Sequence, residues 1–129
     1  MKVYFSCSIT GGRAEETMYQ AMVRSMEENG HEVPTAHLSS PEVMVMEQVG
    51  DAVEVFDRDM NWLRECEAVV AEVSTPSHGV GYEIAYALTL GKPVLCLYQT
   101  GKRISKIITG NTSPGLTVRP YHSTEEGLT

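Results

Sequence analysis

The chain has 129 residues, 42% of them hydrophobic, which is enough to bury the core of one compact domain over residues 1–129. Its formal net charge is −7 at pH 7. This charge argues against nucleic acid or an anionic membrane as a partner, because both require a basic surface, but it leaves room for one small phosphorylated ligand.

Apolar runs alternate along the chain with segments in which apolar residues recur at helical spacing. In chain order they predict a strand at 2–8, a helix at 13–29, a short extended strand at 31–37, helical residues at 41–66, a strand at 68–74, a helix at 79–90, a strand at 94–99, a short helix at 103–109 and a strand at 116–121. Gly30 and Gly91 end two of the helices, and Pro34 indicates that its strand lies at an edge. Ser123 and Glu126 are placed to begin one more helix.

This alternation of strands and helices predicts the fold class. Near-continuous apolar strands separated by helices are typical of a parallel sheet with helices on both faces. Right-handed crossovers then favour a doubly wound, five-stranded α/β arrangement of the flavodoxin-like or Rossmann-like kind. Ligands in such folds bind beyond the carboxyl ends of the strands, so we expect the site in the loops after the strands at 2–8 and 68–74.

Both of these loops are rich in serine and glycine. They read SCSITGGR at residues 6–13 and STPSHG at residues 74–79, and each leads into a predicted helix. Free N–H groups at a helix N-terminus favour an anion, although either loop alone could be ordinary turn and capping chemistry. Neither loop has the pattern of a Walker loop or of a dinucleotide fingerprint. Two such loops at one sheet edge favour a phosphate or ribose site.

Two acids occupy apolar helical faces, where an unpaired carboxylate is costly. Asp59 lies on the apolar stripe of the helix before the strand at 68–74, and Glu83 shares a face with Val80 and Ile84. Either acid could cap a neighbouring loop, but both are candidates for function. The helix dipole is expected to hold Glu83 ionised as a nucleophile, and apolar surroundings are expected to raise the pKa of Asp59 as a proton donor. Two carboxyl groups, one held ionised and the other held protonated, are typical of enzymes that carry out glycosyl transfer.

Two further side chains could belong to the same edge. Tyr4 lies in the first strand, where a buried hydroxyl needs a partner such as a carboxylate, although an ordinary core tyrosine fits the pattern equally well. His37 follows the second predicted strand, and a surface histidine is the plainer interpretation. Trp62 beside Asp59 could stack on a base, but a core or interface role fits its position better.

The cysteines and histidines indicate the environment of the chain. Cys7, Cys66 and Cys96 lie in apolar patterns and are odd in number, which favours a reducing cytoplasm over a disulfide framework. The four histidines have no metal-ligand spacing, so we expect no metal. No apolar run approaches the roughly 20 residues of a membrane span.

Three stretches together resemble a known family. VYFSCSITGGR, DMNWLRECEAVVAEVSTPSHGVGYE and GKPVLCLY are similar to the nucleoside 2-deoxyribosyltransferase superfamily, and most of all to its 2′-deoxynucleoside 5′-phosphate N-hydrolase branch. The resemblance spans about residues 3–110. It implies a flavodoxin-like homodimer that cleaves deoxynucleoside monophosphates to a free base and deoxyribose 5-phosphate, with no metal or organic cofactor.

The motifs of this family imply a role for individual residues. Glu83 in GVGYE matches the nucleophile that forms a covalent glycosyl intermediate, Asp59 in DMNWL matches the second acid, and Tyr4 in VYF matches the tyrosine that orients the glutamate. The implied substrate contacts are Ser8, Ile9, Gly11, His37, Ser77, Gly79 and, from the neighbouring subunit, Ser105.

One departure from the branch keeps alternatives open. Thr10 stands where the branch has arginine, so the base and sugar preferences are undecided. The chain could instead exchange bases as a deoxyribosyltransferase, or act on ribonucleotides such as CMP, or bind a nucleotide without turnover. The paired acids argue against the last alternative, because two carboxylates near a phosphate do not contribute to the binding of an anion.

Overall fold

The computed structural model of the chain describes residues 1–9, 16–40, 51–124 and 127–128. Its main sheet has four parallel strands, which in spatial order are β1 (Val3–Ser6), β2 (Ala68–Glu72), β3 (Val94–Gln99) and β4 (Leu116–Tyr121). The helices are α1 (Glu16–Glu28), the short 3-10 helix η1 (Ala36–Ser39), α3 (Ala52–Glu65), α4 (His78–Thr89) and α5 (Lys106–Thr109). None of the helices in the described ranges is long and apolar enough to cross a bilayer.

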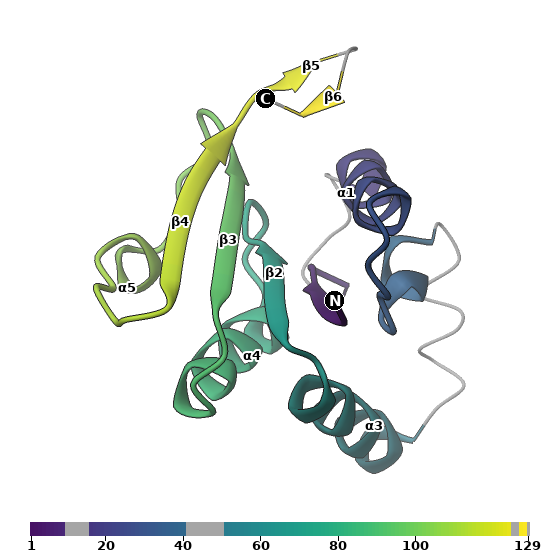
Figure 1. The fold of residues 1–129 in the computed structure, drawn as a ribbon. Coiled ribbons are helices and arrows are strands. Elements are labelled where there is room, and N and C mark those ends of the chain that lie inside the picture. The colour runs from purple at the N-terminus through teal and green to yellow at the C-terminus, as the bar shows by residue number, and fades with distance from the viewer. Residues whose placement is uncertain (10–15, 41–50, 125–126, 129) are drawn as a thin grey trace.

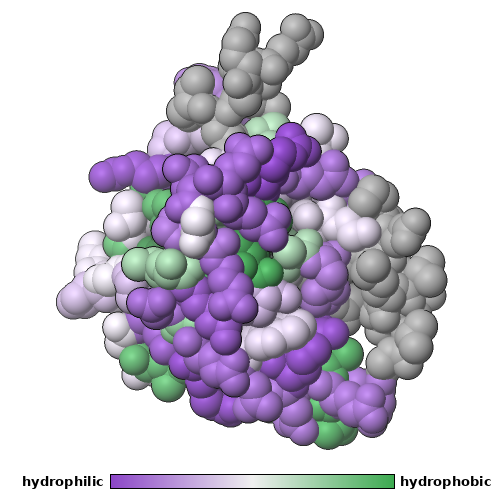
Figure 2. Space-filling view, turned by 45° about the vertical axis from the view of Figure 1, so that its right-hand side comes forward, coloured by the Kyte–Doolittle hydropathy of each residue, from purple (hydrophilic) through white to green (hydrophobic). Residues whose placement is uncertain are grey.

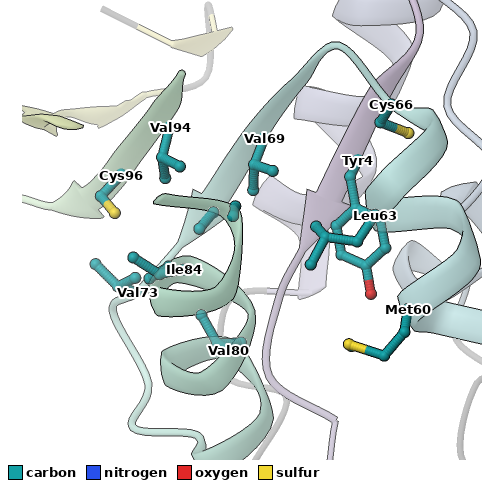
Figure 3. Packing of buried hydrophobic residues seen from close by; sticks show 12 residues of the cluster. Tyr4, Met60, Leu63, Cys66, Val69, Val73, Val80, Ile84, Val94 and Cys96 are labelled. Carbon is teal, nitrogen blue, oxygen red and sulfur yellow. The ribbon is translucent and has the colours of Figure 1, made fainter. Parts of the chain in front are cut away.

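Helices cover both faces of the sheet, as expected for a doubly wound fold. Side chains along a strand alternate between the two faces, so Tyr4 packs with α3 and α4 while its neighbour Phe5 packs with α1. Figure 1 shows α1 on the opposite side of the sheet from α3 and α4. Figure 3 shows the Tyr4 ring next to Leu63 of α3 within the first of these two cores.

The strand order places a switch point beside β1. After β1 the chain passes through α1 to a segment that runs along one side of β1, and it returns through α3 to β2 on the other side. Ser6 pairs in register with Ala71, so the carboxyl ends of β1 and β2 lie together. Ligands bind at this edge of the sheet in doubly wound folds, and both serine-rich loops begin at this edge.

The prediction of a fifth strand at 31–37 is wrong within the described residues. This segment makes a single bridge, between Lys2 and Glu32. Pro34 cannot donate to a ladder, and Thr35 pairs with β1 through its side chain instead. The Thr35 hydroxyl accepts from the N–H of Phe5 at 2.9 Å and donates to the carbonyl of Phe5 at 2.8 Å. A side chain thus replaces the neighbouring backbone, and the chain turns into η1.

Other boundaries differ from the predictions in smaller ways. The helix expected over 41–66 is described as α3 from Ala52, and residues 41–50 lie outside the described residues. The helix expected over 103–109 is shortened to α5. The helix expected to begin at Ser123 is wrong, because β5 (Ser123–Thr124) pairs antiparallel with β6 (Gly127–Leu128). A segment of about two turns has little intrinsic helical stability, and backbone pairing supplies hydrogen bonds instead.

The surface of the molecule is largely hydrophilic in the view of Figure 2. Figure 2 shows that hydrophilic residues cover most of one face, with hydrophobic residues in small separate patches. The large apolar side chains that are exposed on α3, α4 and α5 are Val53, Phe56, Tyr82 and Ile107, and Met1 and Leu90 are exposed outside these helices. Most of the remaining large apolar residues lie in the two cores described above.

The pairing of Thr35 with Phe5 leads to a stability prediction. Thr35→Val keeps the side-chain shape but leaves the buried N–H and carbonyl of Phe5 without this partner, so we expect the free energy of unfolding to fall by about 2–3 kcal/mol in urea denaturation. Thr89→Val is the matched control, because the Thr89 hydroxyl bonds an exposed helical carbonyl, and we expect a loss below about 0.5 kcal/mol there. Equal losses at the two positions would contradict the assignment.

Candidate active site

The Glu83 carboxylate is held by the first strand. Glu83 is the sixth residue of α4, a helix that begins at the cap residue Ser77, whose hydroxyl accepts from the N–H of Val80 at 3.4 Å. The Tyr4 hydroxyl donates to Oε2 of Glu83, and the Ser6 hydroxyl donates to Oε1 at 2.8 Å. Residues two apart on a strand point to the same face, so β1 supplies both donors to one carboxylate.

Tyr4 has the partner that its position predicted. Its side chain is fully buried, and burial, followed by the negative charge of Glu83, raises its pKa. The hydroxyl therefore keeps its proton and acts as a donor. Ser6 was not singled out from the sequence, although its spacing from Tyr4 was a usable signal.

The protonation of Glu83 differs from the expectation. Burial raises the pKa of Glu83 to about 7, the hydrogen bonds from Tyr4 and Ser6 oppose this rise, and the charge of Asp59 adds to it. The prediction that the helix dipole holds Glu83 ionised is wrong, because the dipole acts mainly within the first helical turn and Glu83 lies in the second. Near neutral pH, Glu83 is present in both protonation states.

Asp59 does not stand alone on an apolar face. Both Nε and one terminal nitrogen of Arg58 lie 2.9 Å from Oδ1 of Asp59, and the Asp59 side chain is 17% exposed. The Arg58 guanidinium lies 4.9 Å from the centre of the Trp62 ring, and that ring packs against His37 with 5.8 Å between ring centres. Sequence reasoning missed Arg58, because the helical pattern does not show which neighbour turns toward an acid.

Glu83 and Asp59 face one cavity of about 740 Å³. This volume lies within the usual range for small-molecule sites. The described residues that line it come from the loop after β1 and from α3 and α4, and they are Cys7, Ile9, Ala52, Val55, Phe56, Asp59, Met60, Ser77, His78, Gly79, Val80, Tyr82 and Glu83. The acids and the start of α4 therefore share one hollow with an apolar wall, a combination that suits a ligand with both a flat apolar part and an anionic part.

The structure brings together most of the residues singled out from the sequence. The cavity lining includes Ile9, Asp59, Ser77, Gly79 and Glu83, with Tyr4 directly behind Glu83. Ser8 is fully buried and His37 packs against Trp62, and the described lining includes neither of them. Thr10 and Gly11 lie outside the described residues.

Ser105 lies at a separate place. The Ser105 hydroxyl caps α5 by accepting a hydrogen bond from the N–H of Ile107 at 3.2 Å, and Ser105 is exposed. It lines a second hollow of about 360 Å³, which shares Ser77, His78 and Val80 with the first cavity. Within one chain, Ser105 therefore lines a hollow that borders the turn before α4, and it is absent from the described lining of the first cavity.

A second buried acid, Glu72, was missed. It is the last residue of β2, it has no exposed surface, and it accepts hydrogen bonds from Ser74 and Tyr121. The usable signal was an acid inside the apolar run at 68–73, where a strand buried on both faces has no solvent for a charge. Among the described residues, no group of histidine, cysteine and acidic side chains could hold a metal ion.

Comparison with known proteins connects this geometry to a family. The model of the nucleoside 2-deoxyribosyltransferase family matches residues 3–125. A protein of Methanococcoides burtonii, provisionally named 2′-deoxynucleoside 5′-phosphate N-hydrolase 1, is 40% identical over 119 residues, which are 92% of this chain and 98% of that protein. The 5-hydroxymethyl-dUMP N-hydrolase of Rattus norvegicus is 41% identical over 112 residues, covering 84% of this chain and 68% of the relative.

A solved structure supports the fold. The CMP N-glycosidase of Clostridium botulinum superposes with a TM-score of 0.69 over 95% of this chain and 91% of that chain. Its sequence is 19% identical to this one, so the likeness concerns the arrangement of helices and strands.

The raised pKa of Glu83 leads to a pH-dependent stability prediction. The folded chain binds this proton more tightly than the unfolded chain, so the stability present below about pH 4.5 is lost as the pH rises through about 7. Glu83→Gln removes this loss. We expect the variant to be more stable than the wild type by about 2 kcal/mol at pH 8, and to have no advantage at pH 4.5, in urea unfolding.

The control for this prediction is Asp57→Asn, which removes an exposed acid from the sixth position of α3, the position that Glu83 has in α4. It should change stability by less than about 0.5 kcal/mol at either pH value. A Glu83→Gln advantage that does not depend on pH would contradict the raised pKa.

Proposed function

The chain belongs to the nucleoside 2-deoxyribosyltransferase family, and from this premise we propose that it hydrolyses the N-glycosidic bond of 2′-deoxynucleoside 5′-monophosphates. The products are a free base and deoxyribose 5-phosphate. The observation that carries the proposal is the Glu83 carboxylate, which Tyr4 and Ser6 hold at the wall of a cavity that also contains Asp59. The names of two relatives that are about 40% identical support the same reaction class.

Glu83 acts as the nucleophile in this proposal. Its carboxylate attacks C1′ of the sugar, the bond from C1′ to the base nitrogen breaks, and the base leaves with the electron pair. Tyr4 and Ser6 orient the two oxygens of Glu83 throughout. A pKa of about 7 makes the carboxylate more basic than an exposed one, but only its ionised fraction attacks, so catalysis gains as the pH rises through this value.

Asp59 acts first as the general acid and then as the general base in this proposal. It protonates the departing base in the first step, and the Arg58 guanidinium beside it then stabilises the carboxylate that remains. In the second step Asp59 takes a proton from the water that attacks C1′, and Glu83 leaves the sugar. Two inversions give overall retention, a mechanism for which carboxyl groups about 5 Å apart are typical.

The start of α4 is the proposed phosphate site. The first N–H groups of a helix lack helical partners, and the dipole favours an anion there. Ser77 adds a hydroxyl, and a Cβ built on Gly79 would meet only the Ser77 hydroxyl oxygen, at 4.0 Å, so the backbone is open to a ligand. From their motif positions in the loop after β1, Ser8 is proposed as a further phosphate contact, and Ile9 and Gly11 are proposed as substrate contacts. His37 is proposed as a substrate contact from its motif position.

A homodimer completes the proposed site. Ile107, the second residue of α5, is 84% exposed, and it adjoins Ser105 on a surface that would pair with a second copy. In such a pair Ser105 would contact the phosphate of the neighbouring subunit. We also propose a single domain, without a metal or organic cofactor, and a cytoplasmic location, for which the three buried free cysteines are suited.

Chromatography of released base is the test of the reaction. The substrates are the four common deoxynucleoside monophosphates, the matching nucleosides and the ribonucleotides, CMP included. We expect release from deoxynucleoside monophosphates, and a loss of about a thousandfold or more in Glu83→Gln, because no other group can take the place of the nucleophile.

Other outcomes would redirect the assignment. Base exchange in the presence of a free acceptor base would identify a transferase, and release from CMP alone would identify a ribonucleotide glycosidase. A folded wild-type chain that releases no base from any member of the panel would overturn the proposal.

Mixed dimers test the role of Ser105. Neither Ser105→Ala nor Glu83→Gln alone should give full activity. When the two variants are mixed at random, half of the dimers contain one of each and one intact site, so about a quarter of the wild-type activity should return. If Ser105 acts within its own chain, or if the chain is monomeric, mixing should restore nothing.

A further inference from the structure

Glu72 lies at the sheet edge of the candidate active site but on the other face. Its neighbour Ala71 packs with α3 and α4, whereas Tyr121, which bonds to Glu72, packs with α1. The described lining of the cavity does not include Glu72. The sheet therefore separates this carboxylate from Glu83, and Glu72 has no direct path to a ligand in the cavity.

The hydrogen bonds of Glu72 join three elements. The N–H of Ser74 donates to Oε1 at 2.6 Å, the Ser74 hydroxyl donates to Oε2 at 2.9 Å, and the Tyr121 hydroxyl also donates to Oε2. The Ser74 hydroxyl in turn accepts from the N–H of Gln99 at 2.8 Å. One buried carboxylate thereby ties Ser74, the second residue after β2, to the carboxyl ends of β3 and β4.

A carboxylate is a costly way to fill this position. Burial of a charge is unfavourable unless donors satisfy it, and a well-packed apolar side chain usually gives at least equal stability. The hydrogen bonds of Glu72 converge on Ser74, which has 6% exposure and stands only three residues before Ser77. What these bonds determine is the position of the turn at 74–77.

The two sides of the site have separate anchors. Glu83 is oriented from β1 by Tyr4 and Ser6, and these bonds do not involve Ser74. The turn at 74–77, which ends at the cap of α4, is anchored through Glu72. A disturbance of the second anchor should therefore displace the phosphate site before it displaces the nucleophile.

We propose that Glu72 is a positioning residue for phosphate recognition. Together with Tyr121, it holds the turn at 74–77 in the position at which Ser77 and the first N–H groups of α4 contact the 5′-phosphate. This inference rests on the proposed function for the identity of the ligand. It assigns Glu72 no contact with the substrate and no part in bond breaking. Its effect is confined to the distinction between a phosphorylated and an unphosphorylated ligand.

Tyr121→Phe is the test variant, because it removes one donor to Glu72 and keeps the ring. The probes are dUMP and 2′-deoxyuridine, with affinities measured by calorimetry in a Glu83→Gln background so that neither ligand is turned over during the titration. We expect the Kd for dUMP to rise about tenfold and the Kd for deoxyuridine to change less than about twofold. With Glu83 in place, the kcat at saturating dUMP should stay within about twofold of the wild type, because the anchors of Glu83 are intact.

Tyr98→Phe is the matched control. Tyr98 lies on β3 next to Gln99, packs on the opposite face of the sheet, and has no hydroxyl hydrogen bond among the described residues. It should leave both affinities unchanged. Ser74→Ala is the second variant and decides the question if Tyr121→Phe does not fold, as judged by thermal melting. It removes the hydroxyl that joins Glu72 to Gln99, so it should give the same selective loss for dUMP.

The outcomes separate this inference from the proposed function. An equal loss for dUMP and deoxyuridine, a fall in kcat without a change in dUMP affinity, or unchanged affinities in both variants would overturn the role of Glu72. A wild type that binds dUMP no better than deoxyuridine would overturn it as well. If the wild type releases no base but prefers dUMP, the proposed hydrolase fails, and the selective loss in the variants still supports the role of Glu72.

Discussion

A carboxylate removed from water must find hydrogen-bond donors, and Glu83 finds them on a strand 79 residues earlier in the chain. The parallel pairing of β1 with β2 brings the ends of these strands together, and α4, which follows β2 and packs against β2 and β3, places Glu83 within reach of Tyr4 and Ser6 on β1. Tyr4 and Ser6 meet both oxygens of Glu83 only because this arrangement holds. The cavity, its second acid and the start of α4 all take their positions relative to this contact.

An acid with little solvent exposure lies against each face of the sheet, Glu83 of α4 on one side and Glu72 of β2 on the other, and the two acids have different surroundings. Glu83 borders the cavity and is exposed to a ligand there, whereas Glu72 is enclosed by protein. Each costs stability that the apolar cores on the two faces must offset. Such costs are common at functional sites, where the geometry required by a ligand takes precedence over the most stable packing.

The elements with strong patterns were predictable, and those with weak patterns were not. Long apolar runs and clear helical spacing placed β2, β3, β4 and α4 within a few residues, because burial decides such segments locally. The segment at 31–37 also looked extended. There, however, the Thr35 hydroxyl forms hydrogen bonds with the N–H and the carbonyl of Phe5. No local sequence pattern shows whether a segment will pair with a strand through a side chain or through its backbone.

By itself the sequence determined the fold class, the edge of the sheet at which the candidate cavity lies, and two acids where apolar residues were expected. Periodicity and turn chemistry are local properties, and they suffice for these conclusions. Only the tertiary structure decided the partners of those acids and the protonation of Glu83. Arg58 turns toward Asp59, and burial raises the pKa of Glu83 to about 7 although it lies near the start of a helix. The reason is physical: a pKa depends on the desolvation, donors and charges that the folded chain assembles around a group, and the donors to Glu83 come from a distant strand.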